Sequence, residues 1–255
     1  MRRRGKVVVD DATEESAAVA RLCGVNQTAS TFAPALDERA GLVERPQDAL
    51  ATAVACRALD ILVSAAALVL LAPLLLAIAA AIRLDSRGRA LFRQERIGRD
   101  MEPFVVNKFR TMHVDTANDE HRAFVERLIA GDAECHSALF KLATDDRVTR
   151  VGRVLRKTSL DELPQLINVL HGRMSLVGPR PCLDYEAAKY PPHAFGRFAV
   201  KPGMTGLWQV SGRSALSFEE MIALALEYAR SRSLWLNVRI LARTVPVVLV
   251  GKGAA

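Results

Sequence analysis

The 255-residue chain is poor in the residues that define several classes of protein. Its four cysteines are widely spaced and follow neither CxxC nor zinc-ligand spacing, which argues against a disulfide framework. The 15 glycines and 11 prolines are ordinary numbers for this length, so collagen-like and low-complexity chains are excluded. Aromatic residues make up only 5%, which leaves few side chains that could stack on nucleic-acid bases.

Positive charge, by contrast, is in excess. The chain carries 35 Lys and Arg against 28 Asp and Glu, and its isoelectric point is about 9.6. A basic protein favours an anionic partner, which is nucleic acid, phospholipid headgroups or a phosphorylated small molecule. The hydropathy of the chain selects among these partners.

Residues 61–82 form an apolar run without a charged residue, interrupted only by Ser64 and Pro73. A run of this length is typical of a membrane helix, whereas a helix in a soluble core normally keeps a polar face. Proline removes a helical hydrogen bond, and the arginines on both flanks prefer the cytoplasmic side. We expect a membrane helix over residues 57–84, kinked at Pro73, that either spans the bilayer or re-enters on the cytoplasmic face. A nucleic-acid partner is not expected.

The run divides the chain into a loosely ordered N-terminal extension, residues 1–56, and a cytoplasmic domain, residues 85–255. The fold class is predicted to be α+β with helices dominant. The residue patterns predict short strands at residues 90–93 and 104–109, and helices at residues 116–129, 163–170, 217–230 and 234–249. The last helix alternates cations with aliphatic residues, so it either lies on the membrane surface as an amphipathic helix or packs in the core.

Residues 150–181 surround the carboxylate pair Asp161 and Glu162 with cations. This composition suits phosphoryl chemistry, in which cations bind phosphate oxygens, one carboxylate holds Mg²⁺ and the other acts as base or nucleophile. The alternative is a helix cap, because Ser159 and Glu162 match the S-x-x-E capping box. Pro164 weakens the alternative, since proline is tolerated only within about the first four helical positions. The helix should therefore not begin before Asp161.

Several motifs then carry a resemblance to a known family. KFRTM (residues 108–112), RVTRVGRVLRK (147–157), KTSLDELPQLINVLHGRMSLVGPRP (157–181) and KPGMTGLWQVSGR (201–213) closely resemble the bacterial sugar transferases. These are monotopic phosphoglycosyl transferases. The likeness runs from about Arg57 to Gly253 and includes an F-x-Q-x-R-x-G element at residues 92–98.

The resemblance implies transfer of a sugar 1-phosphate from a UDP-sugar to a polyprenyl phosphate, undecaprenyl phosphate by default, with release of UMP. This would be the first membrane step of exopolysaccharide or glycoconjugate synthesis, at the cytoplasmic face of the bacterial inner membrane. Membrane lipids are implied as partners, Mg²⁺ as cofactor, and a homodimer is compatible with it. The membrane helix would be re-entrant.

The resemblance also implies residue roles. Asp161 would be the nucleophile that forms a phosphosugar-aspartyl intermediate, and Glu162 would help to hold Mg²⁺. The expected substrate-binding residues are Lys108, Arg110, Arg156, Pro179, Arg180, Pro181, Gln209 and Arg213.

Two positions depart from the family pattern. Ala225 and Asn237 stand where the family has aspartates. If the first aspartate organised metal or phosphate, its loss would lower activity or shift the task to Glu220 or Glu227. The alternative function is therefore a catalytically weakened, membrane-bound scaffold of a polysaccharide assembly complex.

Overall fold

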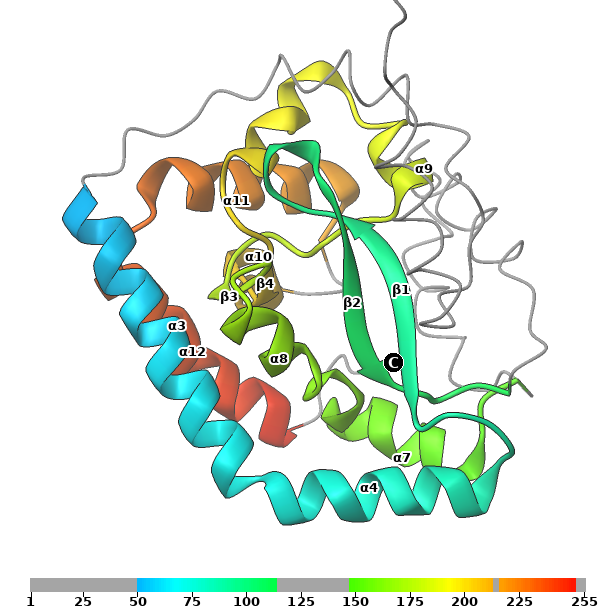
Figure 1. Cartoon of the computed structure of the whole chain (residues 1–255). Helices are drawn as coiled ribbons and strands as arrows, with labels where there is room; N and C mark the ends of the chain where they lie inside the picture. The colour runs from blue at the N-terminus through cyan, green and yellow to red at the C-terminus, as the bar shows by residue number, and fades with distance from the viewer. Residues whose placement is uncertain (1–49, 114–146, 213–215, 251–255) are drawn as a thin grey trace, which may run out of the picture.

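The computed structural model describes residues 50–113, 147–212 and 216–250 (Figure 1). The structure is dominated by helices, and its described part contains two small sheets of two strands each. The predicted helix at residues 116–129 lies outside the described residues. In chain order the elements are α3 (Leu50–Leu70), α4 (Ala72–Asp85), β1 (Leu91–Ile97), the 3₁₀ helix η1 (Arg99–Met101), β2 (Pro103–Phe109), α7 (Arg150–Thr158), η3 (Leu160–Glu162), α8 (Gln165–Leu170), β3 (Ser175–Val177), α9 (Asp184–Ala187), η4 (Pro192–Ala199), β4 (Gly203–Thr205), α10 (Leu207–Ser211), α11 (Phe218–Ser231) and α12 (Leu234–Val250).

The apolar segment forms two helices, α3 and α4, which run in different directions (Figure 1). The break lies at Leu71, two residues before the expected kink at Pro73. Proline lacks the N–H that a residue in the first turn of a helix would leave unpaired, so Pro73 is accommodated in the first turn of α4 and the break falls before it. Helix α3 already starts at Leu50, so residues 50–56 are helical and do not belong to a loosely ordered extension.

Helix α3 has the reverse of the pattern of a soluble helix. Its buried side consists of Cys56, Asp60 and Ser64, spaced four residues apart. The large apolar side chains point outward, and Leu62 and Leu70 are 69% and 77% exposed. Among the described residues, α3 is the one helix that is long and apolar enough to cross a membrane.

Asp60 fixes this apolar helix to the rest of the protein. Its Oδ1 atom accepts hydrogen bonds from the hydroxyl of Ser175 at 3.0 Å and from the backbone N–H of Leu176 at 2.8 Å. Both donors belong to β3, and all three groups are buried. A buried carboxylate requires such partners, because removal from water without them is costly.

Both ends of the α3–α4 pair are attached to the same body. Near the start of α3, Arg57 donates to the carbonyls of Val169 and Leu170, the last residues of α8, at 2.6 and 2.7 Å. At the end of α4, Asp85 accepts a hydrogen bond from the backbone N–H of Val151, in the first turn of α7. The α3–α4 corner lies between these two attachments.

The central hairpin is antiparallel, with Leu91 opposite Phe109 and Ile97 opposite Pro103. Helix α8 lies between α3 and this hairpin (Figure 1). The side-chain oxygen of Asn168 in α8 accepts a hydrogen bond from the backbone N–H of Asn107 at 3.0 Å, and its amide group donates to the carbonyl of Val105 at 2.6 Å. These two contacts fix α8 to β2.

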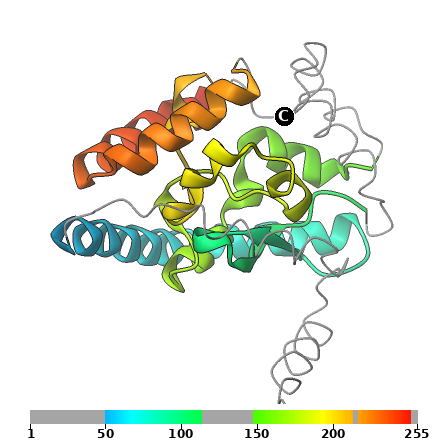
Figure 2. The same cartoon turned by 90° about the horizontal axis from the view of Figure 1, so that it is seen from above.

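Viewed from above, α3, α4 and the hairpin form one layer, and α11 and α12 lie behind it (Figure 2). Strand β3 pairs with β4 in parallel. The main core fills the space between these layers with side chains that include Val106, Leu166, Met174, Tyr228 and Ile240. The predicted helices at residues 217–230 and 234–249 are confirmed as α11 and α12.

Asp60→Ala should destabilise the protein by about 1–3 kcal/mol, because the two donors of β3 lose their buried acceptor. The measurement is thermal unfolding of the full chain in detergent, where we expect a fall of several degrees. Ser64→Ala is the matched control, since this buried hydroxyl has no hydrogen-bond partner in the described structure. Equal stability of the Asp60→Ala and Ser64→Ala variants would contradict the anchoring role.

Candidate active site

The carboxylate pair lies in a short turn between two helices. Helix α7 is capped by Thr149, which accepts from Gly152 N–H at 2.9 Å, and it ends where Ser159 adopts a left-handed conformation with φ of 57°. Asp161 and Glu162 follow in η3. The side chain of Ser159 makes no capping hydrogen bond, so the capping-box alternative is wrong. Helix α8 itself begins only at Gln165, two residues later than expected.

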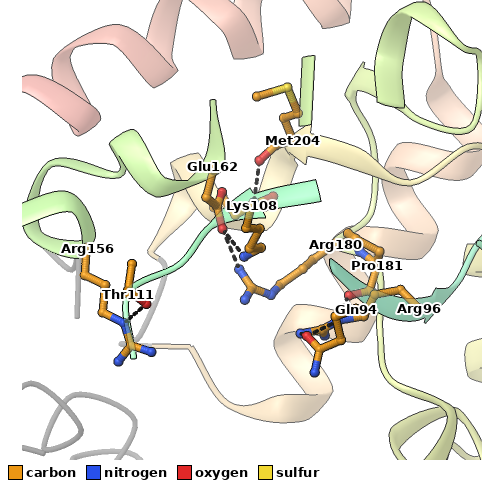
Figure 3. A network of polar contacts seen from close by, with 10 residues as sticks. Gln94, Arg96, Lys108, Thr111, Arg156, Glu162, Arg180, Pro181 and Met204 are labelled. Atoms are coloured by element: carbon orange, nitrogen blue, oxygen red, sulfur yellow. Dashed lines mark hydrogen bonds and ion pairs between the residues drawn. The ribbon is translucent and has the colours of Figure 1, made fainter. Parts of the chain in front are cut away.

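Glu162 is the centre of a cluster of charges (Figure 3). Its Oε1 atom lies 2.7 Å from Lys108 Nζ and 3.9 Å from Arg180 Nη1. Burial alone would raise the pKa of Glu162, but the two cations outweigh burial and hold that pKa at about 2. Glu162 is therefore ionised at neutral pH.

Asp161 has the opposite environment although it is the neighbouring residue. Burial raises the pKa of Asp161 to about 6, and the negative charge of Glu162 adds to the effect, against the cations Lys108 and Arg156. Adjacent carboxyl groups whose pKa values are pushed apart are typical of acid, base or nucleophile pairs in active sites. At pH 7 the Asp161 carboxylate is largely ionised and poorly solvated.

The turn that carries Arg180 is held through its backbone. Arg197, which is buried, donates to the carbonyl of Arg180 at 2.7 Å. The guanidinium of Arg96 donates to the carbonyl of Pro181 at 3.3 Å, and the next carbonyl, of Cys182, accepts from the backbone of β1. Three consecutive carbonyls are therefore fixed, which directs the Arg180 side chain towards Glu162.

Around Glu162 the structure forms a small pocket with only about 10 Å³ of free space, close to the volume that one water molecule needs. A diphosphate can enter only if Lys108 and Arg180 move away from Glu162 and contact the phosphate oxygens. The lining residues are Arg96, Val106, Lys108, Glu162, Gln165, Arg180, Pro181, Gly203, Met204 and Gln209.

Half of the expected substrate-binding residues meet at this pocket. Lys108, Arg180, Pro181 and Gln209 line it, and Gln209 donates to the Met204 carbonyl at 3.2 Å. Arg156 lies to one side, where its Nε donates to Thr111 at 3.1 Å (Figure 3).

The remaining expected residues lie elsewhere. Arg110 is buried and donates to the backbone carbonyls of Ser86 and Arg87, so it secures the end of α4 and does not line the pocket. Pro179 is buried and contributes its carbonyl to Gly203 N–H at 2.9 Å. Arg213 lies outside the described residues.

Arg96 is a pocket residue whose role the sequence reasoning missed. In the sequence it was considered as one of the arginines that flank the apolar run, but Arg96 contacts Gln94 at 2.7 Å and the Pro181 carbonyl. Its place in the F-x-Q-x-R-x-G element was the available signal. Gln165, Val106 and Met204 also line the pocket, and no sequence signal distinguished them.

Ala225 and Asn237 are outside the pocket. They are 3% and 1% exposed and belong to α11 and α12. The Tyr228 hydroxyl lies 2.9 Å from both Asn237 Oδ1 and the carbonyl of Val177, so Asn237 is part of a buried hydrogen-bond network. The two departures from the family pattern therefore leave the charged cluster around Glu162 intact.

The carboxylates present fit one mode of Mg²⁺ binding. The described residues contain no group of three or more His, Cys, Asp or Glu that could hold a metal by themselves. Mg²⁺ is commonly held by one or two carboxylates together with substrate phosphates, and Glu162 would supply one such carboxylate. Glu162 would have to exchange Lys108 for the metal.

Comparison with known proteins identifies the family. Residues 51–251 match the family described as bacterial sugar transferase, so the chain belongs to that family. Its sequence is 43% identical over 207 residues to the UDP-glucose:undecaprenyl-phosphate glucose-1-phosphate transferase of Caulobacter vibrioides, covering 78% of this chain and 71% of the relative. It is 39% identical over 201 residues to the exopolysaccharide production protein ExoY of Rhizobium meliloti, covering 79% and 88%.

Other relatives are longer. An uncharacterised sugar transferase of Haemophilus influenzae is 40% identical over 208 residues, which are 80% of this chain but 43% of the relative. The chain thus spans about two fifths of the length of several relatives that it matches. The family match, residues 51–251, includes the carboxylate pair and the residues that line the pocket.

Neutralising the two carboxylates should change stability in opposite directions. The pKa of Asp161 is raised, so its ionised form costs stability above pH 6 and costs none below about pH 4. Asp161→Asn should therefore unfold about 2–6 °C higher than the wild type at pH 8, and the gain should shrink between pH 6 and pH 4.

Glu162→Gln should unfold at a lower temperature than the wild type. The pKa of Glu162 is lowered, so its contribution is complete above about pH 4.5 and is lost as the pH falls towards 2. The decrease in unfolding temperature should be constant between pH 8 and pH 5. Thermal unfolding of both variants measured across this pH range tests the two predictions. Equal shifts of the same sign would show that the two carboxyl groups share one environment.

Proposed function

We propose that the protein transfers a sugar 1-phosphate from a UDP-sugar to a polyprenyl phosphate at a membrane, and that UMP is released. The observation that carries the proposal is the pair Asp161 and Glu162, one poorly solvated and one bound by two cations. The names of relatives in Caulobacter vibrioides and Salmonella typhimurium describe undecaprenyl-phosphate sugar phosphate transferases, which supports the same reaction class.

In the first half-reaction, a carboxylate oxygen of Asp161 attacks the phosphorus that carries the sugar. The new oxygen–phosphorus bond forms while the bond from this phosphorus to the bridging oxygen breaks, and UMP leaves with the bonding electrons. A raised pKa marks a carboxylate that is incompletely solvated, so less water must be removed before it attacks. The product is a phosphosugar-aspartyl intermediate.

In the second half-reaction, a phosphate oxygen of the polyprenyl phosphate attacks the same phosphorus. Asp161 leaves as a carboxylate, and the product is a polyprenyl diphosphate sugar. Covalent catalysis allows the two anionic substrates to use one small basic pocket in turn.

The cations around Glu162 stabilise the charge that develops on the phosphate oxygens. Lys108 and Arg180 reach Glu162 from β2 and from the turn after β3, so both can exchange that carboxylate for a diphosphate (Figure 3). Mg²⁺, when bound by Glu162 and the diphosphate, would supply further neutralisation of charge. Arg156 lies beside Asp161 and balances its charge before the attack.

Re-entrant membrane association explains the form of the α3–α4 pair. Because Arg57 ties the start of α3 to α8 and Asp85 ties the end of α4 to α7, both ends belong to one side of the bilayer. A spanning α3 would need its N-terminal half on the other side, away from α8 and β3. The outward apolar side chains of both helices would then lie in the inner leaflet, with the pocket on the cytoplasmic side of a bacterial inner membrane.

A scaffold without catalysis is the weaker alternative. The reason for considering a scaffold was that Ala225 and Asn237 replace two aspartates of the family pattern. Both residues, however, are buried in the core and do not line the pocket. Glu220 accepts from the Ser217 N–H at the start of α11, and Glu227 is exposed on that helix, so neither replaces a pocket carboxylate.

Incubation of the full chain with Mg²⁺ and a panel of UDP-sugars, without acceptor, should add one sugar phosphate to the protein and release one equivalent of UMP. Intact-mass analysis and peptide mapping should place the adduct on Asp161. Asp161→Asn should lose the adduct and reduce turnover by at least about 10³-fold. Asp184→Asn is the matched control. Full turnover by Asp161→Asn, or an adduct on another residue, would overturn the covalent scheme.

The re-entrant arrangement predicts that both ends of the helix pair are accessible from the cytoplasm. Leu50→Cys and Leu84→Cys, each in a variant whose native cysteines are replaced, should react with a membrane-impermeant maleimide only in inside-out vesicles. Leu71→Cys, at the corner, should stay unlabelled from either side. Labelling of position 50 from the periplasmic side would instead establish a spanning α3.

A further inference from the structure

A second cavity lies at the closed end of the β1–β2 hairpin and has a volume of about 220 Å³. It shares no lining residue with the pocket around Glu162, and Lys108 lies five residues, about 16 Å along β2, from Pro103 at its edge. Three segments that are distant in sequence form its walls. Its lining residues are Gly98, Arg99, Asp100, Glu102, Pro103, Phe104, Gly172, Arg173 and Lys201.

Cations from three segments line this cavity, and a fourth cation lies behind its wall. Arg99 comes from the hairpin turn, Arg173 from the turn after α8 and Lys201 from the segment before β4. Arg57 of α3 approaches from behind Gly172. A Cβ atom at Gly172, where φ is 76°, would stand 3.4 Å from Arg57 Nη2 and 3.5 Å from Lys201 Nζ.

The acidic groups nearby are fewer. Asp100 forms an ion pair with Arg99 at 3.2 Å, and Glu102 is exposed at the edge of the cavity. Asp60 attracts Lys201 from within the protein, but its Oδ1 already accepts two hydrogen bonds from β3. Three cations thus line the cavity against two acids of its wall, and Arg57 lies behind the wall with its guanidinium bonded to the carbonyls of Val169 and Leu170.

Two of the cations lack a direct partner. In the described part of the chain, the side chains of Lys201 and Arg173 make neither a hydrogen bond nor an ion pair. Burial lowers the pKa of Lys201, and the positive charges of Arg57 and Arg99 lower it further. An anion bound between these groups would relieve the repulsion.

We propose that this cavity binds a phosphate group, carried either by a phospholipid headgroup or by a free phosphate compound. Phosphate oxygens accept charge-assisted hydrogen bonds from arginine and lysine, and the cavity presents both. Val54 and Ile61, one turn before and after Arg57, are exposed apolar residues of α3. A lipid headgroup would therefore lie beside an apolar surface, and this source of the phosphate rests on the membrane association proposed above.

The test is a titration of the full chain in a neutral detergent, followed by thermal unfolding. The probes are inorganic phosphate, dihexanoyl phosphatidylglycerol and dihexanoyl phosphatidylcholine. We expect phosphatidylglycerol or inorganic phosphate to raise the unfolding temperature in a saturable manner, by about 3–5 °C at ten times the midpoint concentration. The variant Arg173→Gln/Lys201→Gln should lose this shift.

Controls separate the two phosphate-binding regions. Lys189→Gln/Arg230→Gln removes the same charge from exposed positions that line neither cavity, and should keep the shift. Lys108→Gln should also keep it, because Lys108 belongs to the other pocket. The single variant Arg173→Gln changes an exposed side chain, so a weakened shift there supports the site even if the double variant unfolds.

The three probes identify the source of the phosphate. A shift with inorganic phosphate shows that the phosphate group alone is recognised, and a shift with phosphatidylglycerol but not inorganic phosphate assigns a lipid. Absence of a saturable shift with any probe, or an equal shift in Arg173→Gln/Lys201→Gln, would overturn the proposal. Neither outcome involves UDP-sugar turnover, so the catalytic proposal would be unaffected.

Discussion

The ion pair between Lys108 and Glu162, 2.7 Å long, is the contact on which the candidate site depends. It joins the central hairpin to the turn between α7 and α8, so it sets the position of both neighbouring carboxyl groups. It also separates their chemistry, because Glu162 receives the direct contact and keeps its charge, while Asp161 receives burial and the repulsion of its neighbour. Two neighbouring carboxyl groups thereby have different pKa values, to which Arg180 and Arg156 also contribute.

The apolar helices are held by polar contacts. Asp60, which is buried, together with Arg57 and Asp85 connects α3 and α4 to the rest of the protein. Helix α4 is also held by apolar packing, because Ile78 and Ile82 are buried against Phe109 and Leu155. The buried residues of α3 are Cys56, Asp60 and Ser64, which is the reverse of a soluble helix, where apolar side chains are buried. If α3 lies in lipid as proposed, its apolar side chains gain little from burial in protein, and the hydrogen bonds of Asp60 and Arg57 supply its attachment.

The sequence predicted the elements that depend on local pattern and the site that depends on a contiguous motif. The S-L-D-E segment and its following proline were sufficient to reject a simple cap, and the structure agrees. Contacts between segments that are distant in the sequence could not be predicted from local patterns. Arg110 follows Lys108 by two residues in the same motif, yet its side chain donates to the backbone carbonyls of Ser86 and Arg87 after the end of α4. Asp60 lies one residue before the uncharged run, and only the fold places it beside β3.

The attachment of Asp60 has a consequence for synthesis of the chain. Its hydrogen-bond partners lie 115 and 116 residues later in the sequence. Under the membrane association proposed above, this carboxylate has no partner when α3 leaves the ribosome and stays hydrated, which opposes burial of its helix in hydrocarbon. Insertion of α3 would then be completed only after β3 has been made and has folded against it.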